Sequence, residues 1–97
     1  MTRKEESSVD INKKELSIFH SVFYRLYGKL INFSDYYLSD REAAKEVVQD
    51  VFLKFWEGNY DIVKLECSGE LDPLLYKMTK NKCLDLIRHK KVELKYN

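Results

Sequence analysis

Apolar side chains recur along the first half of the chain with the spacing of one helical face. Their positions follow alternating steps of three and four residues: Leu16, Phe19, Phe23, Leu26, Leu30, Phe33 and Tyr37. This pattern predicts a long amphipathic helix near residues 12–38, which begins at Asn12 with Glu15 as its capping partner. Val22 and Ile31 widen the apolar face beyond the narrow seam of a coiled coil. We therefore expect this helix to pack within a bundle.

A second helical pattern begins after a capping signal at Ser39. Ser39 and Glu42 have the spacing of a capping box, in which the first residue caps the helix and the second reaches back to it. The sequence therefore predicts a helix near residues 40–57. Its apolar positions form one broad face: Ala44, Val47, Val48, Val51, Phe52, Phe55 and Trp56. The opposite face is acidic and polar and includes one leucine: Glu46, Gln49, Asp50 and Leu53.

The third helical pattern follows a long connection. Residues 57–72 show no clear period, so the sequence predicts a loop there. Asp72 and Pro73 suit the start of a helix near residues 73–92, because aspartate caps helices and proline fits the first helical position. On a helical wheel, one side of this helix is suited to the core: Leu75, Tyr76, Met78, Thr79, Cys83, Leu86 and Ile87. The opposite side is largely basic: Lys77, Lys80, Asn81, Leu84, Arg88 and Lys91.

These three segments predict an all-α fold. We expect one small bundle of three main helices over residues 12–97, preceded by a flexible lead at residues 1–11. The composition agrees, because three glycines and one proline are few for the many turns of a multi-stranded sheet. We also expect Cys83 to lie in the core and Cys67 in the connection.

The charges of the chain are segregated along its length, although the net charge is only +1. Residues 35–72 hold ten acids and four bases, whereas residues 77–97 hold seven bases and two acids. The bases of the second segment also gather on one face of the predicted third helix. A face that only confers solubility usually mixes both signs. The pattern therefore favours contact with a nucleic acid over a simple solvated face.

Several classes of function find no support in the sequence. No P-loop, dinucleotide fingerprint, zinc-protease motif or nucleophile elbow is present, so we expect no catalytic residue. Two cysteines and two histidines lack metal-ligand spacing, so we expect no metal and no other cofactor. The longest uncharged run, nine residues, is too short to cross a bilayer, and no secretion signal precedes it. We expect a cytoplasmic protein without membrane insertion.

Two stretches of the chain resemble motifs of one protein family. Residues 44–56 are similar to the second-region helix of sigma-70-family transcription initiation factors, most of all those of the extracytoplasmic-function group. Residues 74–88 are similar to the promoter-reading helix of that group, with Leu-Tyr followed by Asn, Asp and Arg. The order and spacing of the two motifs also agree, and the resemblance extends over about residues 16–91.

This resemblance implies a function for each of the two polar faces. One set of residues would bind the clamp helices of the large β′ subunit of the RNA polymerase core: Glu46, Gln49, Asp50 and Leu53. Another set would contact DNA of the promoter −10 element and help to melt it: Lys77, Lys80, Asn81, Leu84, Arg88 and Lys91. The connection 57–72 would form a pocket for one extruded base. The side-chain amide of Asn81 would both donate hydrogen bonds to this base and accept them from it. The resemblance also implies an anti-sigma factor as a possible partner.

Two features depart from the family pattern. Leu74 stands where the family usually has tryptophan, which affects the packing at the start of the last helix. The chain ends at Asn97, whereas such factors usually continue into a second helical domain that reads the −35 element. We therefore expect this chain to be an excised domain.

Two other functions fit the same charge pattern. The first is a non-enzymatic helical protein–protein interaction module with a basic nucleic-acid-binding face. The second is an RNA-binding helical domain. Binding to isolated clamp helices of the polymerase separates these alternatives, because only a sigma factor requires it.

Overall fold

The structure, a computed structural model, describes the backbone of residues 12–96 and the side chains of residues 13–90. This part of the chain forms four helices in the order α2 (Asn12–Leu38), α3 (Arg41–Glu57), α4 (Ile62–Ser68) and α5 (Leu71–Tyr96). The predicted all-α class is confirmed, and α2, α3 and α5 are the three main helices that the apolar patterns predicted. The predicted lead at residues 1–11 and the side chain of Asn12, for which capping was predicted, lie outside the described residues.

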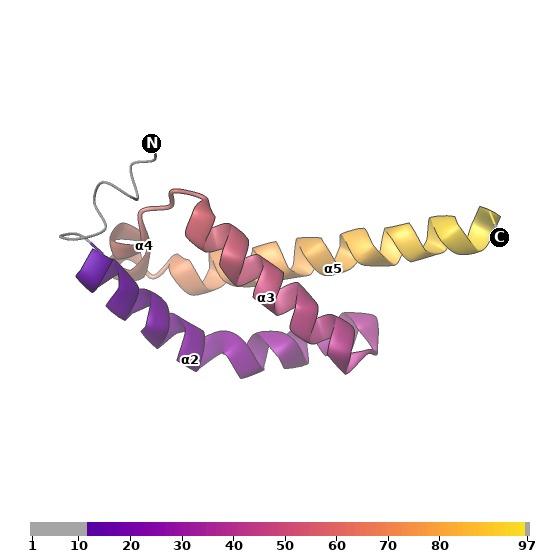
Figure 1. Ribbon diagram of the computed structural model, residues 1–97, viewed down its shortest axis with the longest axis horizontal. Coiled ribbons are helices and arrows are strands. Elements are labelled where there is room, and N and C mark those ends of the chain that lie inside the picture. Colours follow the sequence, from indigo (N-terminus) through magenta and orange to yellow (C-terminus); the bar gives the residue numbers. More distant parts are fainter. Residues whose placement is uncertain (1–11, 97) are drawn as a thin grey trace.

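The three long helices pack against one another as a small bundle. Figure 1 shows α3 turning back sharply from the end of α2, and α5 crossing the pair and continuing well beyond it. The short helix α4 lies beside the start of α2 and leads into α5 (Figure 1). None of the described helices is both long enough and apolar enough to cross a membrane.

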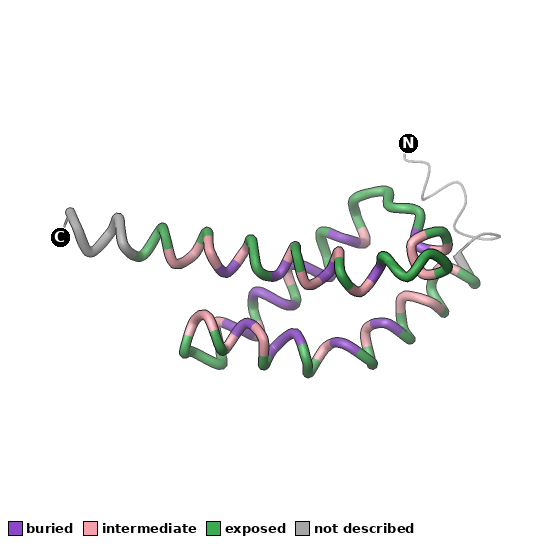
Figure 2. Tube along the Cα trace, turned by 180° about the vertical axis from the view of Figure 1, so that it is seen from behind, coloured by how far each residue is buried: buried purple, intermediate pink, exposed green. Residues whose placement is uncertain are grey.

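The core lies where α2, α3 and α5 face one another, as the buried positions in Figure 2 show. The most deeply buried side chains include Leu30, Val48 and Leu75, one from each main helix. Buried apolar side chains drive this packing, because each removes a large apolar surface from water. The predicted core position of Cys83 is confirmed, whereas Leu16, at the start of the first apolar stripe, is exposed. The pattern therefore located the apolar face correctly, apart from its first residue.

The turn between α2 and α3 differs from its prediction. Asp40, and not Ser39, caps α3, because its Oδ1 accepts a hydrogen bond from the backbone N–H of Ala43 at 3.2 Å. Ser39 instead adopts a φ of 51° and donates its own N–H to the carbonyl oxygen of Asp35. Glu42 does not reach back to the cap, since its carboxylate is highly exposed and pairs with Lys45 at 3.6 Å. Ser39 therefore follows the end of α2, and Asp40, the next residue, caps the start of α3.

The connection predicted at residues 57–72 contains the helix α4, so the prediction of a long loop is wrong. Asp61 caps α4 by accepting a hydrogen bond from the N–H of Lys64 at 3.1 Å. Gly69 ends it with a φ of 78°, a left-handed conformation that glycine adopts without strain. Ile62 is buried and attaches α4 to the bundle. A helix of seven residues has too few turns to produce a recognisable period.

The last helix begins earlier than its prediction. Helix α5 starts at Leu71, whose side chain is buried, and the carbonyl oxygen of Glu70 accepts a hydrogen bond from the N–H of Leu74 at 3.1 Å. Pro73 therefore lies inside the first turn, where a missing N–H leaves no helical hydrogen bond unmade. Asp72 does not cap the helix, and its carboxylate binds Arg25 of α2. Burial of Leu71 thus moves the start of the helix by two residues.

Candidate functional site

Two polar surfaces of the bundle contain the residues that the sequence singled out. The first, the α3 face, consists of Glu46, Gln49, Asp50 and Leu53. The second, the basic face of α5, consists of Lys77, Lys80, Asn81, Leu84 and Arg88, and the side chain of Lys91 lies outside the described residues. The buried residues on the opposite side of each helix pack against the core, and each polar surface therefore faces away from it.

Most of the α3 face is open to solvent. Glu46 and Gln49 are exposed, and Leu53 keeps 55% of its surface accessible. On the other side of the helix, Val47, Val48 and Val51 are buried in the core. An exposed leucine flanked by polar side chains can serve as an apolar anchor for a partner protein.

Asp50 differs from the other residues of the α3 face. Its side chain is half-buried, and its Oδ2 lies 3.4 Å from Nζ of Lys82 on α5. That oxygen is itself buried, and it accepts no hydrogen bond from the described residues. Buried carboxylate oxygens normally accept hydrogen bonds, so this one is incompletely satisfied. Asp50 thus lies at the edge of the α3 face that is nearest to α5.

The basic face of α5 has the orientation that the helical wheel predicted. Lys77, Lys80, Asn81 and Arg88 are exposed, and Leu84 is half-buried. On the core side of the same helix, the side chains of Leu75, Thr79 and Cys83 are buried. The hydroxyl of Thr79 donates a hydrogen bond to the carbonyl oxygen of Leu75 at 2.7 Å. The long cationic side chains therefore extend into solvent from a rigid helix.

One acid modifies the basic face. Asp85 accepts a hydrogen bond from Nη2 of Arg88, three residues further along α5. Both side chains are exposed, so the pair is weak and its members can exchange partners. A phosphate can therefore compete with Asp85 for the guanidinium group, which binds phosphate oxygens well.

Asn81 lies on the side of α5 that faces α3. It lines a hollow of about 280 Å³ between the two helices, with these neighbours: Asp50, Val51, Lys54, Met78, Lys82 and Asp85. No residue from 64 to 71 lines this hollow. In this hollow Asn81 lies together with residues of α3. The base pocket formed by Asn81 and the connection stays a prediction. Lys54 and Lys82 also line this hollow, and the sequence did not single them out because their wheel positions lie outside the two polar faces.

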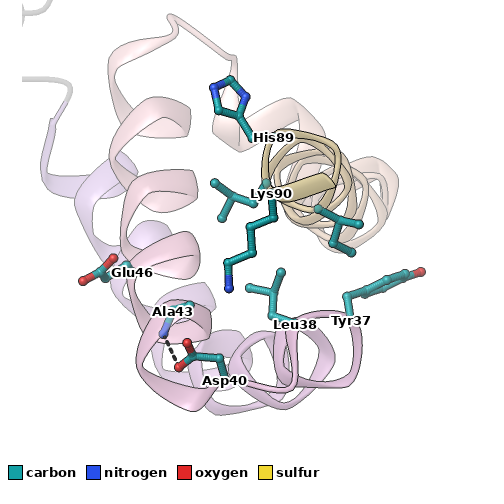
Figure 3. Close-up of a pocket in the computed structure, with 9 residues that line it drawn as sticks. Tyr37, Leu38, Asp40, Ala43, Glu46, His89 and Lys90 are labelled. Atoms are coloured by element: carbon teal, nitrogen blue, oxygen red, sulfur yellow. Dashed lines mark hydrogen bonds between the residues drawn. The ribbon is translucent and has the colours of Figure 1, made fainter. Parts of the chain in front are cut away.

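A second hollow lies between the α2–α3 turn and the later part of α5. It measures about 370 Å³ and has a mixed lining: Tyr37, Leu38, Asp40, Ala43, Glu46, Leu86, Ile87, His89 and Lys90. Figure 3 shows Lys90 extending from α5 toward Leu38, whereas Glu46 points away. The mixed charges at its rim indicate no particular ligand. Among the described residues, no group of three or more His, Cys, Asp or Glu side chains is arranged to hold a metal ion.

A comparison with family models matches residues 22–92 to sigma-70 region 2. This range includes all of α3 and α4 and most of α2 and α5. The chain belongs to the sigma-70 region 2 family, as the two sequence motifs indicated. Domains of this family act in transcription initiation, in RNA polymerase binding and in promoter recognition. Searches of curated proteins and of solved structures returned no significant match, so the family assignment depends on the family model and agrees with the fold.

Proposed function

We propose that the α3 face binds the clamp helices of the large β′ subunit of RNA polymerase, while α5 recognises the promoter −10 element and helps to melt it. The observation that carries this proposal is the separation of two chemically different faces on two helices that share one core. An acidic face with an exposed leucine suits a cationic protein surface, and a row of exposed cations suits a phosphate backbone. The two motifs of α3 and α5 support membership of the extracytoplasmic-function group.

The α3 face has the composition of a small protein interface. Leu53 supplies an apolar centre, and Glu46 and Gln49 supply a polar rim around it. A partner surface rich in arginine would be attracted by Glu46 and Asp50 and would bury Leu53. The apolar contact supplies affinity and the charges supply the choice of partner.

On the basic face of α5, the cations and the amide would have different functions in DNA binding. Lys77, Lys80 and Arg88 would bind phosphates, which gives affinity without sequence choice. Asn81 offers both a donor and an acceptor and can therefore recognise the edge of a base.

Melting would follow from capture of an extruded base. We propose that α4 and the turns around it, within residues 57–72, receive that base next to the start of α5. A base that leaves the stack loses stacking and pairing energy, and binding of the extruded form compensates for this loss. Capture therefore favours the open strand over the duplex.

A binding measurement with a charge reversal on the α3 face tests the proposal. Glu46→Arg should weaken binding of the chain to a fragment that contains the clamp helices by about 1–3 kcal/mol, because it opposes a cationic surface. Glu70→Arg changes the net charge equally but lies outside α3, at an exposed position before α5, and should bind almost as the wild type does. Equal affinity of both variants would reject the α3 face as the polymerase-binding surface.

A further inference from the structure

The segment that is proposed to receive an extruded base carries the wrong sign of charge for a nucleic acid. Residues 57–72 contain one base, Lys64, and five acids: Glu57, Asp61, Glu66, Glu70 and Asp72. An extruded base brings the phosphates of its own strand with it, and these are anionic. An uncompensated segment of this composition would therefore repel the strand that it is proposed to bind.

A cation from α2 reaches into this acidic segment. The Nη2 atom of Arg25 lies 2.7 Å from Oδ1 of Asp72 and 3.8 Å from Oε1 of Glu66. Within the described part of the chain, Glu66 and Asp72 are the acids of this segment that pair with a cation, and both pair with the same guanidinium group. The three side chains keep 38–39% of their surface exposed, so their charges also act on a ligand in solution.

Asp72 lies close enough to the basic face of α5 to influence it. Asp72 precedes Lys77 by five residues of one helix, which is about 7.5 Å along the axis at about 1.5 Å per residue. The Debye length at physiological ionic strength is about 8 Å, so screening does not remove the effect of one charge on the other. An unpaired carboxylate at Asp72 would therefore weaken the attraction of Lys77 for a phosphate.

We propose that Arg25 is a further determinant of DNA binding, because its charge offsets that of the acids around α4 and allows an anionic strand to approach. The inference rests on the proposed function of α5 and of residues 57–72. Arg25 acts through Glu66 and Asp72 and needs no contact with DNA. It lies on α2, outside the two stretches that resemble the family motifs.

The alternative is that Arg25 only ties α2, α4 and α5 together. Any variant without the ion pair would then bind DNA weakly, whatever its charge. The two roles therefore differ in one respect. If the charge matters, removal of a neighbouring acid restores DNA binding although the pair with Asp72 is still missing.

The test measures the affinity of the chain for a labelled single-stranded −10 oligonucleotide at several salt concentrations. Arg25→Met should lower the affinity about threefold at low salt, the size expected of one unit charge acting over this distance in water. The loss should shrink as the salt concentration rises, because screening shortens the reach of the unpaired carboxylates. Arg25→Lys keeps the charge and should bind almost as the wild type does. Lys45→Met removes a cation that pairs within α3, and it should also bind almost as the wild type does.

Two double variants with the net charge of the wild type separate a local charge effect from a lost tether. Arg25→Met with Glu70→Gln removes an exposed acid two residues before Asp72, and glutamine can still accept the hydrogen bond that Ser68 donates. This variant lacks the pair with Asp72, yet its affinity should return to that of the wild type. Arg25→Met with Glu42→Gln removes an acid from the first turn of α3, at the end of the bundle away from α4 (Figure 1), and should remain weak.

Thermal unfolding verifies each variant, and Arg25→Gln replaces Arg25→Met if the latter does not fold. Equal weakness of the two double variants would overturn the inference and make Arg25 a tether. A loss in Arg25→Met that does not depend on salt would also overturn it. Unchanged affinity of Arg25→Met would reject this inference and leave the proposed function intact, whereas a wild-type chain without affinity for the oligonucleotide would reject both.

Discussion

Arg25 of α2 donates a hydrogen bond from its Nη2 atom to Oδ1 of Asp72 in α5 at 2.7 Å, across 47 positions of the sequence. The same Nη2 atom lies 3.8 Å from Oε1 of Glu66 in α4. The hydrogen bond to Asp72 is the main cause that raises the pKa of Arg25, and the negative charges of Asp72 and Glu66 act in the same direction. One guanidinium group thus connects three helices at the end of the bundle where α4 lies.

We predict that Arg25→Met loosens α4 with only a small loss of global stability. The carboxylates of Glu66 and Asp72 would then lie near each other without a cation between them. Because these side chains are about 38% exposed, the free energy of unfolding should fall by only about 0.5–1 kcal/mol. Hydrogen exchange should accelerate most at the amides of α4. Lys45→Met, which removes a pair within α3, is the control, and unchanged exchange in α4 would contradict the prediction.

Leu53 is predicted to contribute to polymerase binding and not to stability. Leu53→Ser should leave the melting temperature nearly unchanged, because most of the side chain is already exposed to water. Its affinity for the clamp helices should fall by about 1–2 kcal/mol, as expected for loss of an apolar anchor. Tyr36→Ser removes a side chain that is 83% exposed on α2 and should affect neither quantity. If Leu53→Ser binds as tightly as Tyr36→Ser, the leucine is not an anchor.

The exposed cations of α5 are predicted to bind all promoter sequences alike. Lys80→Ala and Arg88→Ala should each weaken binding of every −10 variant equally, and each should reduce the salt dependence by roughly one phosphate contact. Arg88→Ala should have the larger effect, because it leaves the carboxylate of Asp85 unpaired beside the DNA. Binding of polymerase that carries this domain, measured at several salt concentrations, checks the prediction. A salt slope equal to that of the wild type would show that neither residue contacts a phosphate.

Asn81 is predicted to discriminate between bases. Asn81→Ala should leave the salt slope unchanged and flatten the preference at one −10 position by about 1–3 kcal/mol, the value of a good base contact. The same polymerase-binding measurement, repeated with each base at each position, detects this effect. An equal loss of affinity for all four bases together with a changed slope would show instead that Asn81 contacts the backbone.

The two cysteines are predicted to react very differently. Cys67 is exposed, whereas Cys83 is buried. Burial raises the pKa of Cys83 above its ordinary value of 9.0, and the hydroxyl of Ser34 has a smaller effect in the opposite direction. At pH 8 a thiol reagent should therefore modify Cys67 quickly and Cys83 only when the domain unfolds. Rapid modification of both would contradict the buried position of Cys83.

The raised pKa of Cys83 also predicts how stability changes with pH. The folded state keeps its thiol protonated at pH values where the unfolded state has begun to lose the proton. The stabilisation is therefore complete below the pKa of the unfolded thiol and is lost as the pH rises through the higher pKa of the folded one. Above about pH 9 the unfolding free energy of the wild type should fall more steeply than that of Cys83→Ala. Parallel curves would show that the thiol does not contribute.

The sequence alone determined that the three long helices form and which of their faces are buried. The stripe that includes Leu26 and Leu30 predicted α2, and the stripe that includes Val47 and Val51 predicted α3. The basic face of α5 was equally predictable. These features depend on residues three or four positions apart, and local periodicity therefore contains them. The two family motifs lie within α3 and α5.

Only the tertiary structure decided how those faces meet. Asp50 of α3 pairs with Lys82 of α5, and the carboxylate of Asp72 is directed to Arg25, although the partners in each pair are far apart in sequence. The helix α4 exists because burial of Ile62 and the turn at Gly69 stabilise a segment too short for a helical period. Such contacts arise from the angles at which helices cross, and those angles depend on the packing of the whole core, which no local pattern contains.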